Sequence, residues 1–250
     1  MRHTSFVSVR GTSSPTRLRR VPGVRRTACV IVFALMPGIA RAQSSAVVDE
    51  GTFMVTHNGA PIGRESFRIV RAPAPGGQVF RATGQSALGD NRVTTTLGTD
   101  SSGVPVSYEA ELRLRDTVVQ RLQGRGRPGR FSVLLGTKSG ESAREYILNS
   151  GALLIDDDVF HHFFFVPFAA QHAQLIVIAP RATQQERYGL EERGTEDVEI
   201  AGRSIQSRHF ALIGPNGATR DVWIDGKGRL LKVAIAEKGL VALRDDPPRS

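Results

Sequence analysis

The chain has 250 residues and a net charge of +9, and 23% of its residues are charged while 40% are hydrophobic. This composition is typical of a globular protein and excludes a disordered or fibrous one. Residues 1–42 hold eight arginines and no Lys, Asp or Glu, which leaves 25 of the 33 basic residues against 24 acidic ones in the rest. Because the rest is close to neutral, it lacks the excess of positive charge that binding to phosphates requires, and we predict no nucleic-acid partner.

The first 42 residues follow the order of a secretory signal peptide. A basic region at 17–26 precedes an apolar run at 28–36, and the small-x-small triplet Ala40-Arg41-Ala42 comes soon after. The apolar run is much shorter than the roughly 20 residues that span a bilayer. We therefore predict a cleaved signal peptide over 1–42 and export to the periplasm or the extracellular space, through either the general or the twin-arginine route.

The predicted mature chain has no cysteine and no apolar stretch of transmembrane length. Cys29 is the single cysteine, and it lies inside the apolar run of the leader. No disulfide and no thiolate chemistry is therefore expected after cleavage. We expect a single domain over 43–245, followed by a flexible tail over 246–250.

From residue 50 onward the sequence alternates between apolar and polar residues with the period of β-strands. Turn dipeptides such as Asn58-Gly59 separate the strands, and no alternation of strands with helices suggests a parallel sheet. We predict a mainly β protein with a single large, strongly curved antiparallel sheet, which forms a half-barrel or an open barrel. The predicted strands include 52–57, 62–70, 79–87, 93–99, 104–114, 118–122, 131–135, 144–148, 175–178, 186–192, 197–200, 204–212, 218–224 and 230–236.

The segment 104–114 shows the clearest alternation in the chain. Its apolar residues are expected to face the core, while the charged residues between them face solvent. The predicted inward set is Val104, Val106, Tyr108, Ala110, Leu112 and Leu114.

The segment 156–173 breaks this alternation and contains five of the twelve phenylalanines. Three aspartates at 156–158 suit the N-terminus of a helix, so we predict one short helix near 158–171, which Pro167 kinks or ends. Its aromatic face either plugs the concave side of the sheet and completes the core, or acts as a lid over an apolar cavity. At least two of the phenylalanines should be deeply buried against Val106, Tyr108, Ala110 and Leu112. The candidate ligand-binding residues are Phe160, Phe163, Phe164, Phe165, Phe168, Tyr108 and Leu112.

The same segment holds possible metal donors at Asp156, Asp158, His161, His162 and His172. Adjacent histidines point about 100° apart on a helix, and no pair has the spacing of a helical metal motif. The sequence also has no nucleophile elbow, phosphate loop or dinucleotide fingerprint. We therefore predict no metal, no cofactor and no enzymatic activity.

The end of the chain carries a motif in which Val222-Trp223-Ile224-Asp225 is followed by a short turn and an apolar strand. Together with the leader, the opening Asn58-Gly59 hairpin and the central aromatic insert, this layout resembles a family of uncharacterised secreted bacterial β-proteins. In architecture that family is similar to the LolA/LolB-like periplasmic lipoprotein carriers. The resemblance implies a curved antiparallel sheet that holds acyl chains.

Two functions remain open at this point. The first is a non-catalytic periplasmic carrier or binding protein for an apolar molecule, such as a lipid or an acyl chain, in the concave face of the sheet. The second is a structural or interaction protein of the cell envelope, with an envelope protein as its partner and a core filled by its own side chains.

Overall fold

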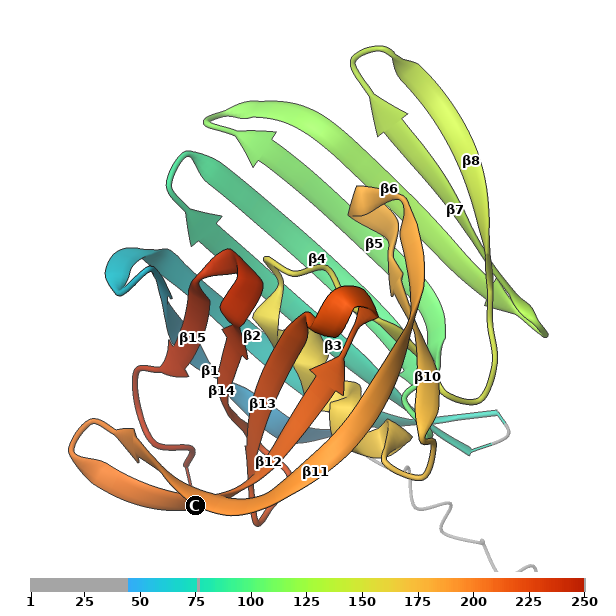
Figure 1. The fold of residues 1–250 in the computed structure, drawn as a ribbon. Helices are drawn as coiled ribbons and strands as arrows, with labels where there is room; N and C mark the ends of the chain where they lie inside the picture. The colour runs from blue at the N-terminus through green and yellow to red at the C-terminus, as the bar shows by residue number, and fades with distance from the viewer. Residues whose placement is uncertain (1–44, 76, 250) are drawn as a thin grey trace, which may run out of the picture. The chain divides into compact units, whose positions relative to one another are not determined.

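The two-residue alternation of the sequence produces fifteen strands, which join in one sheet (Figure 1). A computed structural model of the chain describes residues 45–75 and 77–249. The predicted signal peptide over 1–42 lies outside these residues. The strands are β1 (Ala46–His57), β2 (Ala60–Ala74), β3 (Gly77–Leu88), β4 (Asn91–Asp100), β5 (Pro105–Leu114), β6 (Thr117–Arg127), β7 (Arg130–Thr137), β8 (Gly140–Ile147), β9 (Ala152–Leu154), β10 (Gln174–Ala179), β11 (Gln184–Ile200), β12 (Arg203–Ile213), β13 (Thr219–Asp225), β14 (Leu230–Ile235) and β15 (Leu240–Arg244).

The strands follow the order β8-β7-β6-β5-β4-β3-β2-β1-β15-β14-β13-β12-β11-β10-β9 across the sheet. The Asn58-Gly59 turn joins β1 to β2 as predicted, with positive φ angles of 50° and 81°. The first and last strands of the described sequence also pair, since His57 of β1 lies opposite Leu240 of β15. The strand β15 had not been predicted. The prediction of a mainly β chain with one large curved sheet is confirmed.

The sheet is antiparallel except at one edge, where a single parallel pair makes it mixed. The short strand β9 pairs in parallel with β10, with Leu153 opposite Val177. A parallel pair needs a long crossover connection, and the aromatic insert supplies it. The run Ala152–Leu154 is buried at every position, so it has no alternation by which the sequence could have indicated a strand.

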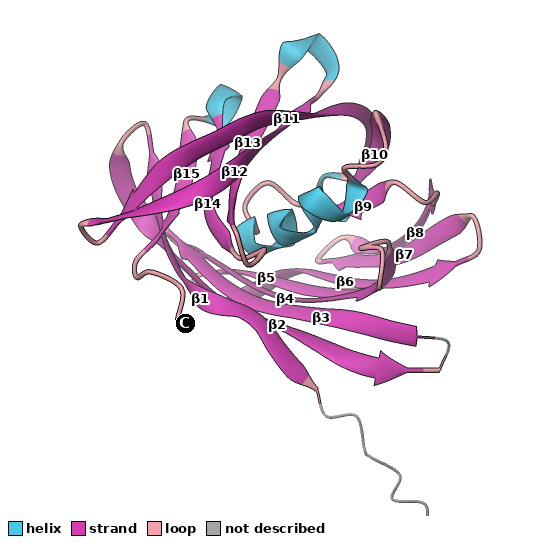
Figure 2. Ribbon diagram, turned by 90° about the horizontal axis from the view of Figure 1, so that it is seen from below, coloured by secondary structure: helices cyan, strands magenta, loops and turns pink. Residues whose placement is uncertain are grey.

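The predicted helix is present as a 3₁₀ helix, η1, over Phe160–Ala169, and it lies inside the curve of the sheet (Figure 2). It packs against strands on both sides of β1 in the sheet order, among them β3, β9, β13 and β14. Pro167 lies in its last turn, and the carbonyl of Pro167 accepts the N–H of Ala170 where the helix ends. The position expected for Pro167 is confirmed.

Three further 3₁₀ helices occur in the described residues, so the prediction of one helix is corrected. Each is a single turn between two strands, and none had a periodic signal in the sequence. They are η2 (Pro180–Ala182), η3 (Pro215–Gly217) and η4 (Ala236–Lys238). Within the described part of the chain, no helix has the length and apolar character needed to cross a membrane.

The predicted alternation of β5 holds only in its middle. Tyr108 and Ala110 are buried, whereas the side chains of Val106 and Leu114 are 43% and 48% exposed. The register shifts between β4 and β5 at Gly98 and Thr99, and again between β5 and β6 at Leu112 and Arg113. A bulge of this kind changes the face to which the following residues point.

The sheet remains open, and the side chain of Gln185 on β11 binds the edge strand β8 at the opposite end of the strand order. The side-chain amide of Gln185 on β11 donates to the carbonyl of Ile147 at 2.7 Å and accepts the N–H of Ile147 at 3.1 Å. These two bonds satisfy backbone groups at the end of the edge strand β8, much as a neighbouring strand would.

Candidate ligand-binding site

The aromatic helix η1 is attached to the sheet through a buried carboxylate on β2. Glu65 is fully buried, and its two oxygens accept the backbone N–H groups of Phe160 at 2.8 Å and of His161 at 2.7 Å. These N–H groups lie in the first turn of the helix and have no partner within it. The carboxylate therefore caps the helix from a distant strand.

The same carboxylate binds the His161 side chain, whose Nδ1 lies 3.0 Å from Glu65 Oε1. Both oxygens of Glu65 already accept backbone N–H groups, so Nδ1 is assigned as the donor in this bond. The ring of His161 stacks on Phe67, and its Nε2 lies 3.4 Å from the hydroxyl of Thr95. Gly84 on β3 makes room for the ring, because a Cβ at this position would lie 2.3 Å from His161 Cε1.

His162 is fully buried, and neither of its ring nitrogens has a hydrogen-bond partner within the described residues. Its ring meets Tyr108 edge-on, with the ring centroids 5.6 Å apart. Burial in these surroundings lowers the pKa of His162 well below its usual value of 6.5, with smaller contributions from His161 and Arg181. His162 is therefore a neutral core residue.

The three aspartates before the helix do not cap it, which corrects the prediction. No acidic residue lies in the first turn of η1, and Val159 at its start makes no side-chain cap. Asp156 instead accepts the hydroxyl of Tyr108 at 2.6 Å and the backbone N–H of Arg181 at 3.2 Å. Burial raises the pKa of Asp156 to about 6.

Asp157 and Asp158 bind cations from other elements of the fold. Both Asp157 oxygens accept from the guanidinium of Arg220 on β13, at 2.7 and 3.0 Å, and Lys238 Nζ lies 2.6 Å from Asp157 Oδ2. Asp158 pairs with Arg181 of η2. The aspartates thus fix the loop before η1 to η2, β13 and η4, and each of these three cations already has a carboxylate partner.

A pocket of about 440 Å³ adjoins this ion-pair cluster, and we call it the aspartate pocket. Leu112 lines it together with the three aspartates, Arg181 and Arg220. Tyr108 lies beside it through its bond to Asp156 but is itself fully buried. The predicted site residues Tyr108 and Leu112 therefore lie at the aspartate pocket. They do not line the separate pocket, described below, to which Phe164 and Phe168 contribute.

Three phenylalanines of η1 (Phe164, Phe165 and Phe168) form one aromatic cluster with Phe80 of β3. The ring centroid of Phe80 lies 6.3, 6.0 and 5.2 Å from those of Phe164, Phe165 and Phe168. Phe160, Phe163, Phe164 and Phe165 are at most 4% exposed, whereas Phe168 is partly exposed. More than two of the five are therefore deeply buried, as predicted, but the ring contacts of this cluster are to Phe80 and not to the inward residues of β5.

Phe164 and Phe168 line a second pocket of about 440 Å³, which we call the phenylalanine pocket. Phe80, Val48 and Ile224 add to its apolar wall, while Arg71, Arg208 and Lys227 contribute the positive charge. Segments far apart in the sequence thus meet here, from β1, β2 and β3 to η1 and the turn between β13 and β14. This is the pocket in which two of the predicted ligand-binding residues come together.

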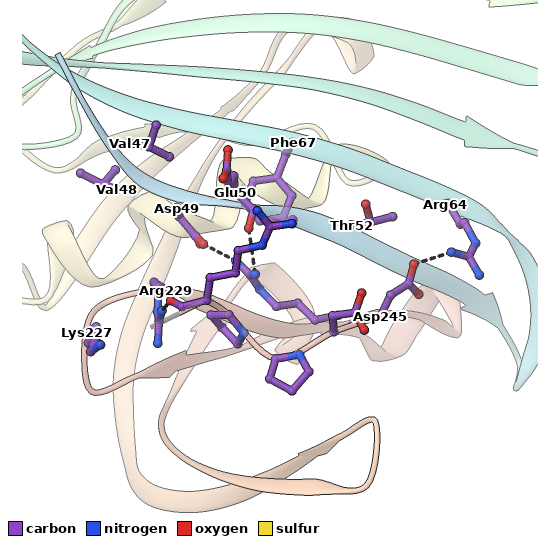
Figure 3. A pocket seen from close by; sticks show the side chains of 16 residues that line it. Val47, Val48, Asp49, Glu50, Thr52, Arg64, Phe67, Lys227, Arg229 and Asp245 are labelled. Carbon is purple, nitrogen blue, oxygen red and sulfur yellow. Dashed lines mark hydrogen bonds and ion pairs between the residues drawn. The ribbon is translucent and has the colours of Figure 1, made fainter.

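A larger, polar groove of about 810 Å³ runs between β1, the β13–β14 turn and the chain end at 245–249, and we call it the terminal groove (Figure 3). Arg64 and Asp245 form an ion pair of 2.5 Å at one end of it. Asp49 and Arg244 are almost fully buried and pair with each other beneath it. Val48 and Lys227 line both this groove and the phenylalanine pocket, so the two are adjacent.

The motif with Trp223 has a structural role on the convex face. Trp223 stacks on His209 with the ring centroids 4.5 Å apart, and Lys232 Nζ lies 4.3 Å from its ring centroid. Asp225 accepts the backbone N–H groups of Lys227 and Arg229, both at 2.9 Å. Asp225 therefore shapes the turn after β13.

The possible metal donors of the aromatic insert do not converge. His161 is bonded to Glu65, His162 faces Tyr108, and the aspartates are engaged with Tyr108 and with cations. No group of three or more His, Cys, Asp or Glu residues within 45–75 and 77–249 is arranged to hold an ion.

Glu65 is the main residue of this site that the prediction missed. Glu65, Phe67 and Ile69 occupy every second position of β2, and all three are buried on the inward face of the strand. A carboxylate on the buried face of a strand needs a partner. This break in the pattern could have indicated a buried contact to the helix.

No protein-family model and no curated protein matches this sequence. Among solved structures, the chain is similar to a beta-barrel-like protein of domain of unknown function DUF1849 from Brucella abortus. The alignment covers 80% of this chain and 97% of that one, with a TM-score of 0.51 and 11% sequence identity. At this identity the similarity concerns the fold alone, and it places the chain beside a β-barrel-like protein.

Proposed function

We propose that the chain is a non-catalytic binding or carrier protein for an apolar molecule, such as a lipid or an acyl chain. The observation that carries this proposal is the phenylalanine pocket, where Phe80, Phe164 and Phe168 provide an aromatic wall beside a volume of about 440 Å³. This volume lies within the range of about 300 to 1,000 Å³ that is usual for small-molecule sites.

The proposed position of the ligand differs from the one that the sequence suggested. The concave face of the sheet is occupied by η1, since Phe160, Phe163 and Phe165 are no more than 2% exposed. A ligand would therefore lie at the end of the helix, where Phe168 is partly exposed. The inner phenylalanines act as the plug, and the last turn of the helix forms the wall of the pocket.

The β-barrel-like fold supports this proposal, because curved sheets of this kind hold ligands at their mouths. The architecture of the lipoprotein carriers, in which a curved sheet surrounds helices and acyl chains, is consistent with it. We further propose that the leader directs export and that the protein acts in the periplasm or outside the cell.

The alternative is a structural or interaction protein of the envelope. The tight burial of four of the five insert phenylalanines favours it, because it leaves the centre of the sheet filled by the protein's own side chains. The two functions differ in one property, which is whether the phenylalanine pocket takes up an apolar molecule.

Native mass spectrometry of the chain from residue 43, purified from cells without detergent, tests the proposal. A carrier should give a species heavier than the apoprotein by the mass of a lipid. Alternatively, a fatty acid added to a carrier that has bound an apolar dye should displace the dye. A single apoprotein mass and no displacement of the dye would contradict the carrier function and support the envelope alternative.

A further inference from the structure

The phenylalanine pocket is lined by both apolar and basic residues. Three basic side chains line it, from Arg71 on β2, Arg208 on β12 and Lys227 in the β13–β14 turn, against the single carboxylate of Asp225. A pocket for a purely apolar molecule gains nothing from this charge. The combination fits a molecule that has both an apolar part and a negative charge.

The charges of the pocket differ in whether they already have partners. Arg208 donates two hydrogen bonds to Glu192, at 2.7 and 2.9 Å, and Asp225 is paired with Arg229 at 2.7 Å. By contrast, neither Arg71 nor the ammonium group of Lys227 forms an ion pair with any carboxylate of the described residues. The uncompensated positive charge at the pocket therefore comes from Arg71 and Lys227.

The position of Lys227 sets where a negative group would lie. Lys227 lines both the phenylalanine pocket and the adjoining terminal groove, where it is labelled in Figure 3. It is exposed, as is Arg71. A ligand whose tail lies against Phe164 and Phe168 would thus reach solvent beside these two cations, with its polar end outward.

We propose, on the basis of the function proposed above, that the ligand is an anionic amphiphile. Its acyl tail contacts Phe80, Phe164 and Phe168, and its carboxylate or phosphate head binds Arg71 and Lys227. Charge-assisted hydrogen bonds from a guanidinium and an ammonium group favour both of these heads over a neutral one. Asp225 does not oppose this, because its charge is neutralised by Arg229.

The test uses three molecules with one tail and different heads, namely dodecanoate, dodecyl phosphate and methyl dodecanoate, titrated by calorimetry into the chain from residue 43. We expect both anions to bind at least about tenfold more tightly than the ester, with an advantage that shrinks as salt is added. The stronger of the two anions identifies the head as a carboxylate or a phosphate. The double variant R71Q/K227Q should lower the affinity for the anions and leave that for the ester unchanged.

Lys138→Gln is the matched control, because it removes one charge in the β7–β8 turn, on a residue that does not line the pocket. It should leave all three affinities unchanged. Equal binding of the anions and the ester, or anion binding unaffected by the double variant, would overturn the anionic head while leaving the apolar carrier intact. If none of the three binds, the proposed carrier function itself fails, and the anionic head fails with it.

Discussion

The carboxylate of Glu65 on β2 binds His161 twice, through its backbone N–H at 2.7 Å and through its ring Nδ1 at 3.0 Å. The two residues are 96 positions apart in the chain, and both are fully buried. The contact therefore joins the sheet to the helix that fills it, and it fixes both the start of η1 and the orientation of its first ring.

Replacing Glu65 with alanine should destabilise the protein by about 3–5 kcal/mol, because two helix N–H groups and an imidazole lose their buried acceptor. Glu65→Gln should cost less, since its amide oxygen can still accept one of these bonds. Urea unfolding measures both. Glu141→Ala on the exposed face of β8 is the control and should change the stability by less than about 0.5 kcal/mol. Equal midpoints for the wild type and Glu65→Ala would contradict this role.

Gly84→Ala should destabilise the protein because its methyl group would collide with the His161 ring, 2.3 Å away. Overpacking of this kind costs about 1–3 kcal/mol. In combination with His161→Ala the cost should shrink, so the double-mutant cycle should give a coupling of at least about 1 kcal/mol. Gly136→Ala is the control, because its nearest neighbour would lie 3.8 Å from the new Cβ. Additive effects of the two changes would show that the ring and the glycine are not in contact.

The stability should depend on pH through Asp156, whose pKa burial raises from 3.8 to about 6. The folded state then binds a proton that the unfolded state has released between about pH 4 and pH 6, so stability falls as the pH rises through this window. The rise of the pKa from 3.8 to about 6 corresponds to about 3 kcal/mol. The free energy of unfolding of Asp156→Asn, measured by urea at each pH, should lack this fall. A parallel pH dependence in the wild type and the variant would refute it.

His162 should have the opposite effect at acid pH, because its pKa is lowered by burial. Below about pH 6.5 the unfolded state takes up a proton that the folded state does not bind, so stability falls as the pH decreases. His162→Leu removes two unpaired ring nitrogens and should be neutral to stabilising, with a larger gain at pH 5 than at pH 8. Thermal unfolding at both pH values measures this, and a variant that is less stable at pH 5 would contradict it.

The phenylalanines of η1 should fall into two classes. Phe163→Ala should cost about 3–5 kcal/mol, since its ring is fully buried. Phe168→Ala should cost clearly less, because this ring is partly exposed at the phenylalanine pocket. Urea unfolding of the two variants compares them under the same conditions. Similar losses at both positions would indicate that Phe168 belongs to the core and not to a pocket wall.

Much of the sheet could be predicted because local sequence determines it. The turn at Asn58-Gly59 and the alternation on either side of it specify a hairpin without any distant contact. The strand β9 could not be predicted in this way, since all three of its residues are buried and its partner β10 is joined to it only through η1. The bulges around β5 were also not predicted, because they arise from the pairing between strands.

The site was predicted only in part, because residues that contact each other in it lie far apart along the chain. Phe164 and Phe168 were candidate ligand-binding residues because the aromatic insert breaks the two-residue period of the strands, which left a core plug and a lid over a cavity as the alternatives. Asp157, however, pairs with Arg220, which is 63 positions away. No local pattern distinguishes this pairing from a helix cap. Arg71 and Lys227 meet the same pocket only because the sheet curves, which no single segment encodes.

The central claim is that Phe168 forms part of a pocket for an apolar tail, and its most direct test is the binding of a fluorescent fatty acid to the wild type and to Phe168→Ser. The wild type should bind the fatty acid, and the variant should bind at least about tenfold more weakly, while its urea midpoint falls less than that of Phe163→Ala. Phe131→Ala, at a fully buried position outside the pocket, is the control, since it should lower the stability without changing the affinity of the folded protein. No binding by the wild type, or equal binding by Phe168→Ser, would contradict the account.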